Sequence, residues 1–403
     1  MTMKIVNKIL IIIVLCTSQV LSSAYAKTDY PIDFWGETIH FNLKHPIQVS
    51  TSFIHEESSI AKIQELIIDA GGNEVANQIE EIVKRKELCN WLAYQLVRKA
   101  ANQLIAKNTD YLGYTTAKWF LMTKLGFDPL LVLSRERAML YIRSNDIIYN
   151  TPFRTINGDQ YVCLNYHDYG YASKQDPDEL MIKSTQNNSN NFTFKINQLP
   201  LLEADNYVCQ DLSFEYGNQT EHIKVRVNKS VKNYFTNYPV TDYYNQFNIP
   251  LSVETKESLV NALKEKIRGM STKDGVEYLM YFTRYAFLFE KDSDFFGREK
   301  RLSPEETLLY GKSDCEDRSA LFYALIKEIY NLPMVVLSYT DHVTVAVKLE
   351  KPIGRPIMYD NELYTICEPT PQKEDLRLGE QLQDTQKKSY EIAFSYKPQK
   401  VNQ

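Results

Sequence analysis

A cysteine at the start of a helical pattern is the residue in this chain best placed to do chemistry. Cys315 is followed by 320–330, where apolar residues recur at helical spacing with one buried face. Ser313 or Asp314 could cap this helix, which would set the Cys315 sulfur near its positive end. Such a position lowers a thiol pKa, and the thiolate is the nucleophilic form. The pattern therefore predicts a reactive thiol.

A base and an acid follow the cysteine in the order that thiol chemistry needs. His342 opens an alternating apolar run, 342–347, that predicts a strand, and Glu368 ends a second strand pattern at 363–367. An imidazole beside a thiol can accept its proton, and a carboxylate can hold the imidazole in the correct orientation. Taken singly, each residue has a plain structural reading as a core or surface residue. Together they predict a Cys–His–Glu site.

Four short motifs carry a resemblance to a known family. SDCEDRS (313–319), DHVTVAV (341–347) and CEPT (367–370) resemble the transglutaminase-like superfamily, which has a papain-like core, and FGREK (296–300) resembles its secreted members from Bacteroidetes-type bacteria. The resemblance implies Cys315 as nucleophile, His342 as general base and Glu368 as the orienting acid. The family usually has aspartate before the proline, so the longer Glu368 side chain requires its strand to sit further back.

The charged residues next to the cysteine have simpler explanations. Glu316 and Asp317 are read as first-turn carboxylates favoured by the helix dipole, and the role of Arg318 is left open. A segment at 292–297 resembles the start of a calcium loop, but the fifth position is Phe296 rather than an oxygen ligand and the twelfth is Ser303 rather than glutamate. The sequence therefore predicts no metal and no cofactor.

Composition excludes several classes of function. The 403 residues carry a formal net charge of −5, with 44% hydrophobic and 24% charged residues. No basic stripe, phosphate-binding glycine loop or zinc-type cysteine pairing is present, so nucleic acid is not an expected partner. The length allows two or three domains.

The first residues predict export. Lys4 and Lys8 flank the start of a short apolar run, 9–15, and Ala24-Tyr25-Ala26 follows as a cleavage sequence. The run is shorter than the roughly 20 residues of a membrane span. We expect cleavage after Ala26 and a periplasmic or extracellular protein without a membrane span. Five cysteines would remain, an odd number that leaves at least one free thiol.

The pattern along the chain divides it into four parts. After a signal peptide at 1–26, residues 27–170 read as a helical and α+β domain, and 171–240 as a small antiparallel β domain, expected to be a sandwich. Residues 241–403 read as the transglutaminase-like catalytic domain. The expected fold class is therefore α+β, with a papain-like core at the C-terminus.

The first domain repeats the pattern of the last. When Pro129 is aligned with Pro333, Tyr111 falls at the Cys315 position, Ala138 at His342 and Asn165 close to Glu368. Identity between the two segments is low, so the match is either a degenerate copy without chemistry or an accident of common helix and strand patterns.

The resemblance and the residues together indicate acyl transfer at an amide through a Cys315 thioester. Hydrolysis of a peptide, protein or peptidoglycan-type amide is the favoured interpretation. The alternatives are a protein cross-linking transglutaminase and a non-catalytic binding or scaffold protein of the cell envelope. The sequence does not define the substrate, the acceptor or the oligomeric state.

Overall fold

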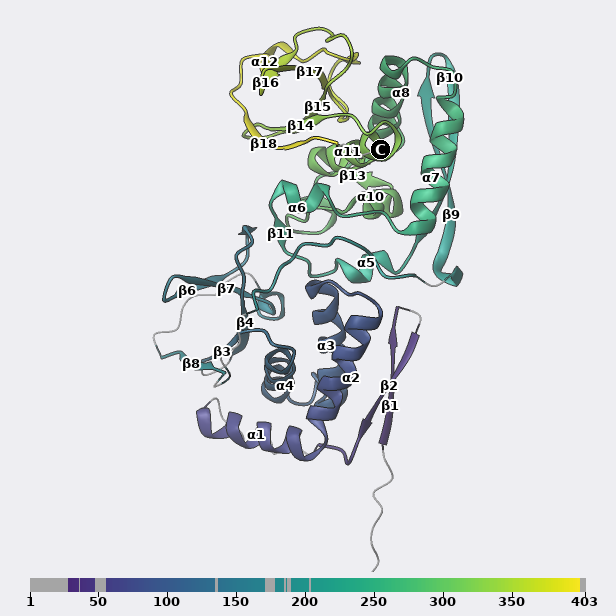
Figure 1. The fold of residues 1–403 in the computed structure, drawn as a ribbon. Coiled ribbons are helices and arrows are strands. Elements are labelled where there is room, and N and C mark those ends of the chain that lie inside the picture. Colours follow the sequence, from purple (N-terminus) through teal and green to yellow (C-terminus); the bar gives the residue numbers. More distant parts are fainter. Residues whose placement is uncertain are drawn as a thin grey trace, which may run out of the picture.

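A computed structural model describes residues 28–35, 37–47, 56–134, 137–170, 178–184, 186, 190–202 and 204–398. Two lobes follow each other along the chain, one built from the purple to blue segments and the other from the teal to yellow segments (Figure 1). Both combine helices with sheets, so the expected α+β class is confirmed. The signal segment lies outside the described residues, and cleavage after Ala26 stays a prediction.

Four helices form the body of the N-terminal lobe. They are α1 (Glu57–Asp69), α2 (Gly72–Arg85), α3 (Asn90–Leu104) and α4 (Tyr111–Lys124), with a hairpin of β1 (Thr28–Phe34) and β2 (Glu37–Leu43) beside them. The hairpin contacts α2 and α3. Residues 112–123 of α4 are buried on every side, as expected of a helix at the centre of a lobe.

A five-stranded antiparallel sheet completes this lobe, and α4 packs on it. Its order is β6-β7-β4-β3-β8. The strands are β3 (Pro129–Leu133), β4 (Ala138–Arg143), β6 (Phe153–Ile156), β7 (Asp159–Cys163) and β8 (Leu180–Lys183). The strands expected at 130–133, 138–142 and 161–164 are confirmed, and the helix expected at 115–125 begins earlier, at Tyr111.

The separate small sandwich expected at 171–240 is not formed by the described residues. β8 joins the N-terminal sheet, and the expected strand at 192–196 is irregular chain whose aromatic and aliphatic side chains enter the N-terminal core. The hairpin of β9 (Tyr207–Tyr216) and β10 (Gln219–Asn228) packs on two helices of the C-terminal lobe, α7 (Val253–Lys266) and α8 (Thr272–Tyr285). A two-stranded hairpin buries too little apolar surface to be stable by itself. Each of these segments therefore packs against one of the two lobes.

Short elements connect the two lobes. β5 (Ile148–Tyr149) of the N-terminal lobe pairs with β11 (Val240–Thr241), and α5 (Val231–Tyr234) lies where the lobes meet (Figure 1). The indole nitrogen of Trp91 on α3 donates to the Tyr234 carbonyl at 2.7 Å. The remaining short turns are η1 (Tyr166–Asp168) and η2 (Ala204–Asn206).

The C-terminal lobe contains the predicted site. Its helices are α6 (Tyr243–Phe247), α7 (Val253–Lys266), α8 (Thr272–Tyr285), α9 (Asp292–Phe295), α10 (Pro304–Tyr310), α11 (Cys315–Ile329) and α12 (Gln383–Gln386). Its sheet has the order β16-β17-β15-β14-β18, formed by β14 (Met334–Ser338), β15 (Val343–Val347), β16 (Ile357–Tyr359), β17 (Glu362–Cys367) and β18 (Glu391–Tyr396). A two-residue parallel pair, β12 (Leu288–Phe289) and β13 (Lys312–Ser313), leads into α11.

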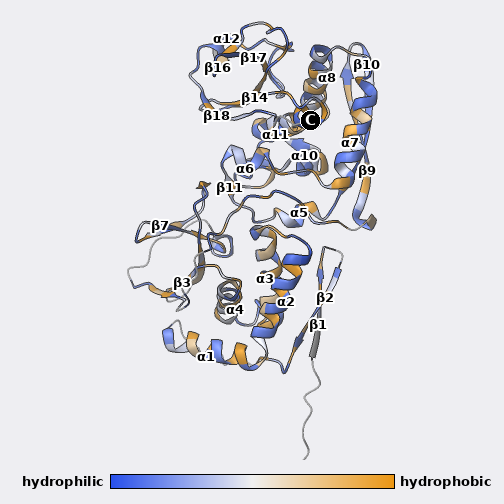
Figure 2. Ribbon diagram, viewed as in Figure 1, coloured by the Kyte–Doolittle hydropathy of each residue, from blue (hydrophilic) through white to orange (hydrophobic). Residues whose placement is uncertain are grey.

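The two sheets have the same connectivity. In chain order, a helix, two central strands, a hairpin and a distant edge strand occur in each, and all strands pair antiparallel. In each sheet, residues of the two central strands are buried on both faces, so that a main core lies on the helix side and a smaller apolar cluster on the other. Figure 2 shows apolar and polar segments alternating along the helices, as expected of helices that bury one side.

Two further findings concern membrane-spanning helices and the cysteines. Among the described residues, no helix combines the length and the apolar character that spanning a bilayer requires. The five described cysteines are all free thiols: Cys163 and Cys367 are buried, Cys89 and Cys315 are half-buried, and Cys209 is exposed.

Candidate functional site

Local chain signals place Cys315 at the first position of α11. Ser303 and Glu306 form a capping box that starts α10, and Gly311 ends it in the left-handed conformation, with φ 66°. The chain then forms β13 and turns into α11 at Asp314, the N-cap residue. Contrary to expectation, Asp314 makes no side-chain capping hydrogen bond, and Ser313 is not the cap.

His342 and Glu368 are brought together as expected. The Nε2 atom of His342 lies 2.7 Å from Oε2 of Glu368, and Glu368 Oε1 accepts from the Thr370 backbone N–H at 3.0 Å. Burial by itself lowers the pKa of His342, but the hydrogen bond and charge of Glu368 outweigh it and raise that pKa above its usual value. The longer glutamate therefore reaches the imidazole, and the pair favours an imidazolium.

Cys315 has a different partner from the expected one. Its thiol donates to Oε2 of Glu316 at 2.9 Å, and in the described part of the chain no hydrogen bond joins it to His342. Burial and the adjacent Glu316 carboxylate raise the pKa of Cys315, although the Val343 backbone N–H acts in the opposite direction. The expectation of a lowered thiol pKa is thus wrong for this arrangement, because burial and a like charge outweigh the helix dipole.

The thiol and the imidazole nevertheless belong to adjoining pieces of structure. Val343, the backbone neighbour of the Cys315 thiol, directly follows His342. The Ser319 hydroxyl, one turn along α11, donates to the Val343 carbonyl at 3.0 Å. Helix α11 is therefore fixed against the start of β15, next to the His342–Glu368 pair.

Two buried arginines hold the backbone around this pair. Arg284 on α8 is 1% exposed and donates to the Glu368 carbonyl from Nε at 3.0 Å and from Nη2 at 2.5 Å. Arg318 is 0% exposed and donates to the carbonyls of Thr283 and Arg284, at 3.1 and 2.6 Å, and to that of Phe287. Arg318, whose role was left open by the sequence, therefore holds the C-terminal end of α8. Arg284 was missed because no local pattern marks an arginine 84 residues from its partner.

The two tyrosines considered as oxyanion donors differ in position. The Tyr339 ring lies 6.2 Å from the His342 ring, centroid to centroid, and its hydroxyl accepts from Gln381 at 2.9 Å. The Tyr310 ring instead packs against the rings of Phe295 and Phe296. Only Tyr339 therefore lies beside the base.

Several carboxylates gather behind the start of α11. Asp292, Asp314 and Asp317 each offer one oxygen within 4.8 Å of the others, and all three residues are buried. Glu299 and Glu316 are close enough to act on them electrostatically. The sequence did not predict this cluster, since Asp292 precedes the cysteine motif by more than twenty residues.

The corresponding place in the N-terminal lobe holds a polar network that includes a thiol at a different position, because the Cys163 thiol donates to Oδ1 of Asn165 at 3.6 Å. Asn165 donates from Nδ2 to the Tyr111 hydroxyl and to the Ala138 carbonyl, both at 2.9 Å. The Tyr111 hydroxyl donates to Asp168 at 2.6 Å. The three positions that align with Cys315, His342 and Glu368 therefore meet here too, but none of these three residues is itself a thiol or an imidazole.

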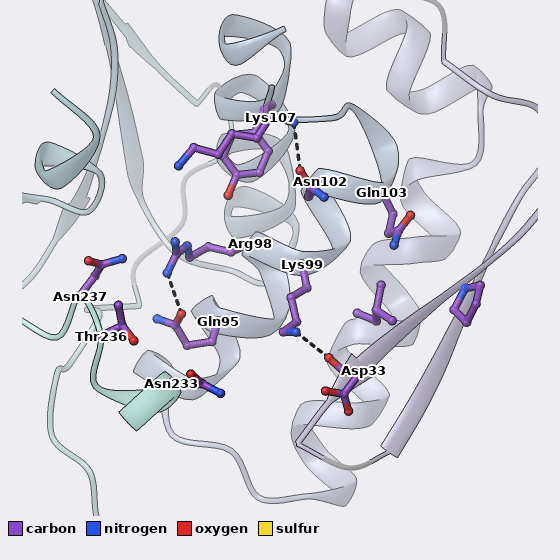
Figure 3. Close-up of a pocket in the computed structure, with 13 residues that line it drawn as sticks. Asp33, Gln95, Arg98, Lys99, Asn102, Gln103, Lys107, Asn233, Thr236 and Asn237 are labelled. Atoms are coloured by element: carbon purple, nitrogen blue, oxygen red, sulfur yellow. Dashed lines mark hydrogen bonds between the residues drawn. The ribbon is translucent and has the colours of Figure 1, made fainter. Parts of the chain in front are cut away.

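A pocket lies beside this network. It has a volume of about 550 Å³ and is lined by residues of α3 and β1, by Lys107 and Tyr114, and by residues within and just after α5. Figure 3 shows Arg98, Lys99 and Lys107 around it together with several amides, with Arg98 bonded to Gln95. Such a lining can bind an anionic or polar group but supplies no nucleophile.

Comparisons of the chain with protein-family models, with curated proteins and with solved structures found no match. What the site can do must therefore be argued from its residues.

Proposed function

We propose that this protein is a thiol enzyme that transfers the acyl group of an amide through a thioester on Cys315. The observation that supports this most is the 2.7 Å pair of His342 and Glu368 beside the start of α11. A carboxylate-bound imidazole next to a helix-borne cysteine is the arrangement in which a thiol can be deprotonated and used as a nucleophile.

The chemistry follows from these three side chains. The Cys315 thiol turns from Glu316 to His342, which accepts its proton, and the sulfur attacks the amide carbon. The carbon–nitrogen bond then breaks, the imidazolium gives its proton to the departing amine, and a thioester remains on Cys315. Water, deprotonated by His342, attacks the thioester to release the acid and restore the thiol. Glu368 holds the imidazole and stabilises its charged form throughout.

The acceptor decides the class of reaction. With water the enzyme is a peptidase or amidase, and with a primary amine it is a cross-linking transglutaminase. We favour hydrolysis, because no acidic or aromatic amine-binding feature is evident in the motifs, and an exported protein meets peptide, protein and peptidoglycan-type amides. The fold assignment as a papain-like transglutaminase core is part of this proposal.

A second candidate is a non-catalytic binding or scaffold protein of the cell envelope. The observation that favours it is the raised pKa of Cys315, which keeps the thiol protonated while it is bonded to Glu316. The polar pocket of the N-terminal lobe would then be the functional feature.

Alkylation of the mature protein distinguishes the two candidates. Iodoacetamide labelling of Cys315 is followed by mass spectrometry from pH 5 to 9 in the wild type and in His342→Ala. Labelling that is consistently faster in the wild type than in the variant supports the enzyme, because it shows that His342 assists deprotonation of the thiol. Equal, slow labelling in both supports the scaffold. Incubation with peptide substrates, with and without a fluorescent primary amine, then separates hydrolysis from cross-linking.

We also propose that the N-terminal lobe is a degenerate copy of the catalytic module. The shared strand order and the meeting of Tyr111, Ala138 and Asn165 support this. Because tyrosine stands at the position aligned with Cys315 and alanine at that aligned with His342, we infer a structural or substrate-binding role for the copy.

A further inference from the structure

The strongest feature outside the proposed triad is the carboxylate cluster behind α11. Asp292 begins α9, Asp314 is the N-cap of α11 and Asp317 is in its first turn. Their exposed fractions are 3%, 9% and 0%. Buried carboxylates are rare unless they are paired with cations, protonated or bound to a metal.

No cation in the described part of the chain forms a direct ion pair with these three groups, although Lys300 and Arg318 act on them electrostatically. Among the described residues, no lysine, arginine or histidine nitrogen lies within 4.0 Å of them. The nearest candidates are used elsewhere, since Lys300 pairs with Glu306 and the Arg318 guanidinium donates to three backbone carbonyls. The cluster is therefore short of positive charge.

Two of the carboxylate oxygens also lack hydrogen-bond partners. Asp317 accepts from the Leu302 N–H through Oδ1 at 2.7 Å, but its Oδ2 is buried with no partner. Oδ1 of Asp314 is likewise buried and without a partner. Asp292 is held by the Lys300 N–H through Oδ2 at 2.7 Å. Unsatisfied buried oxygens call for a cation, a water or a proton, because leaving them unpaired is costly.

The spacing of the oxygens fits a single bound cation. Oxygens that share one divalent ion lie within roughly 5 Å of one another, and a buried site suits calcium better than magnesium, because magnesium gives up its water ligands reluctantly. One oxygen from each aspartate lies within 4.8 Å of the others. Carboxylates are also the ligands that hard divalent cations prefer.

We propose that Asp292, Asp314 and Asp317 form a binding site for one divalent, oxygen-preferring cation, best suited to Ca²⁺. The ion joins α9 to the first turn of α11 and neutralises the buried charge there. This site is separate from the rejected loop at 292–297, because it uses only Asp292 from that segment and takes its other ligands from α11. It does not depend on the proposed acyl transfer.

The competing explanation is that protons neutralise the cluster. Burial raises the pKa of Asp292 to about 7 and that of Asp314 to about 9. A protonated cluster needs no ion, tolerates asparagine and does not respond to calcium.

Calorimetric titration of the EDTA-treated mature protein with CaCl2 near pH 7.5 tests the proposal. We expect one Ca²⁺ per chain, weaker binding of MgCl2, and a melting temperature that rises with each tenfold increase in Ca²⁺. Asp292→Asn and Asp317→Asn should weaken binding at least about tenfold, since each removes one of three charged ligands. Asp294→Asn, which changes an exposed carboxylate on the same short helix, should bind as the wild type does.

Three results would overturn the site. The first is the absence of both binding heat and a calcium-dependent melting temperature in the wild type. The second is unchanged calcium binding in Asp292→Asn. This variant is sufficient to test the site if Asp317→Asn does not fold. The third is an equal loss of binding in Asp294→Asn.

Discussion

The hydrogen bond between Cys315 and Glu316 predicts that removing a carboxylate will activate the thiol. In Glu316→Gln the side chain keeps its shape but loses the negative charge that lies 2.9 Å from the sulfur. The pKa of Cys315 should fall, because a like charge and a hydrogen bond to the protonated thiol both disfavour the thiolate. We therefore expect Cys315 to react faster at neutral pH.

The size of the effect can be worked from the distance. At an effective dielectric constant of about 20, a unit charge 2.9 Å away disfavours the thiolate by at most about 6 kcal/mol. Rotation of Glu316 away from a thiolate and the charge of nearby Arg301 reduce this, so a pKa decrease of about 2 is expected. The thiolate fraction then rises about 100-fold. A less basic thiolate is roughly tenfold less nucleophilic, so the net gain in rate is about tenfold.

Competitive labelling measures this gain with an internal reference. Mature wild type and variant are treated with iodoacetamide at pH 7 in EDTA, which removes divalent cations, and the rate at Cys315 is divided by that at the exposed Cys209. Glu328→Gln, an exposed position at the other end of α11, is the matched control and should leave the ratio unchanged. A ratio that stays constant in Glu316→Gln, or rises equally in Glu328→Gln, would refute the assignment of the raised pKa to Glu316.

Three further outcomes follow from other contacts of the two lobes. Arg284→Met should lower the free energy of unfolding by about 2–6 kcal/mol in urea titrations, because it leaves two buried carbonyls, those of Glu368 and Leu376, without their donor, at roughly 1–3 kcal/mol each. Glu368→Gln should lose about 1–3 kcal/mol of stability at pH 5.5. The pKa of His342 is raised in the folded protein above its unfolded value of 6.5. The loss of stability is therefore complete below pH 6.5 and disappears as the pH rises through the folded pKa. A loss of stability that instead grows from pH 5.5 to 9 would contradict this prediction. Tyr111→Phe should lower the free energy of unfolding by about 1–3 kcal/mol, because Asp168 and Asn165 lose their hydrogen bonds to the Tyr111 hydroxyl. The rate of Cys315 labelling should not change. A changed rate would argue against a purely structural role for that network.

Local patterns were sufficient to predict most elements of both lobes. The helix at 315–329 and the strands around it were predicted because the apolar residues within each element recur at the regular spacing of a helix or a strand. The pairing of His342 with Glu368 was predicted from motif order. The repeated helix and strand pattern in the N-terminal lobe was also visible, and the common sheet order agrees with it.

The predictions were wrong where a residue's environment comes from distant chain. The expected sandwich at 171–240 failed because its segments pack on two different lobes. The prediction of a low pKa for Cys315 took account of the helix dipole but not of burial or of the orientation of Glu316. Neither effect leaves a periodic signal in the sequence.

The sequence by itself determined the helices, the strands and the order of the cysteine, histidine and glutamate, because backbone propensity and apolar spacing act over a few residues. Only the tertiary structure decided which charges meet. It brought Asp292 to the first turn of α11, set Arg284 behind Glu368 and turned the Cys315 thiol toward Glu316. Burial makes such encounters strong, since charges interact far more in a protein interior than in water, and burial is a property of the whole fold.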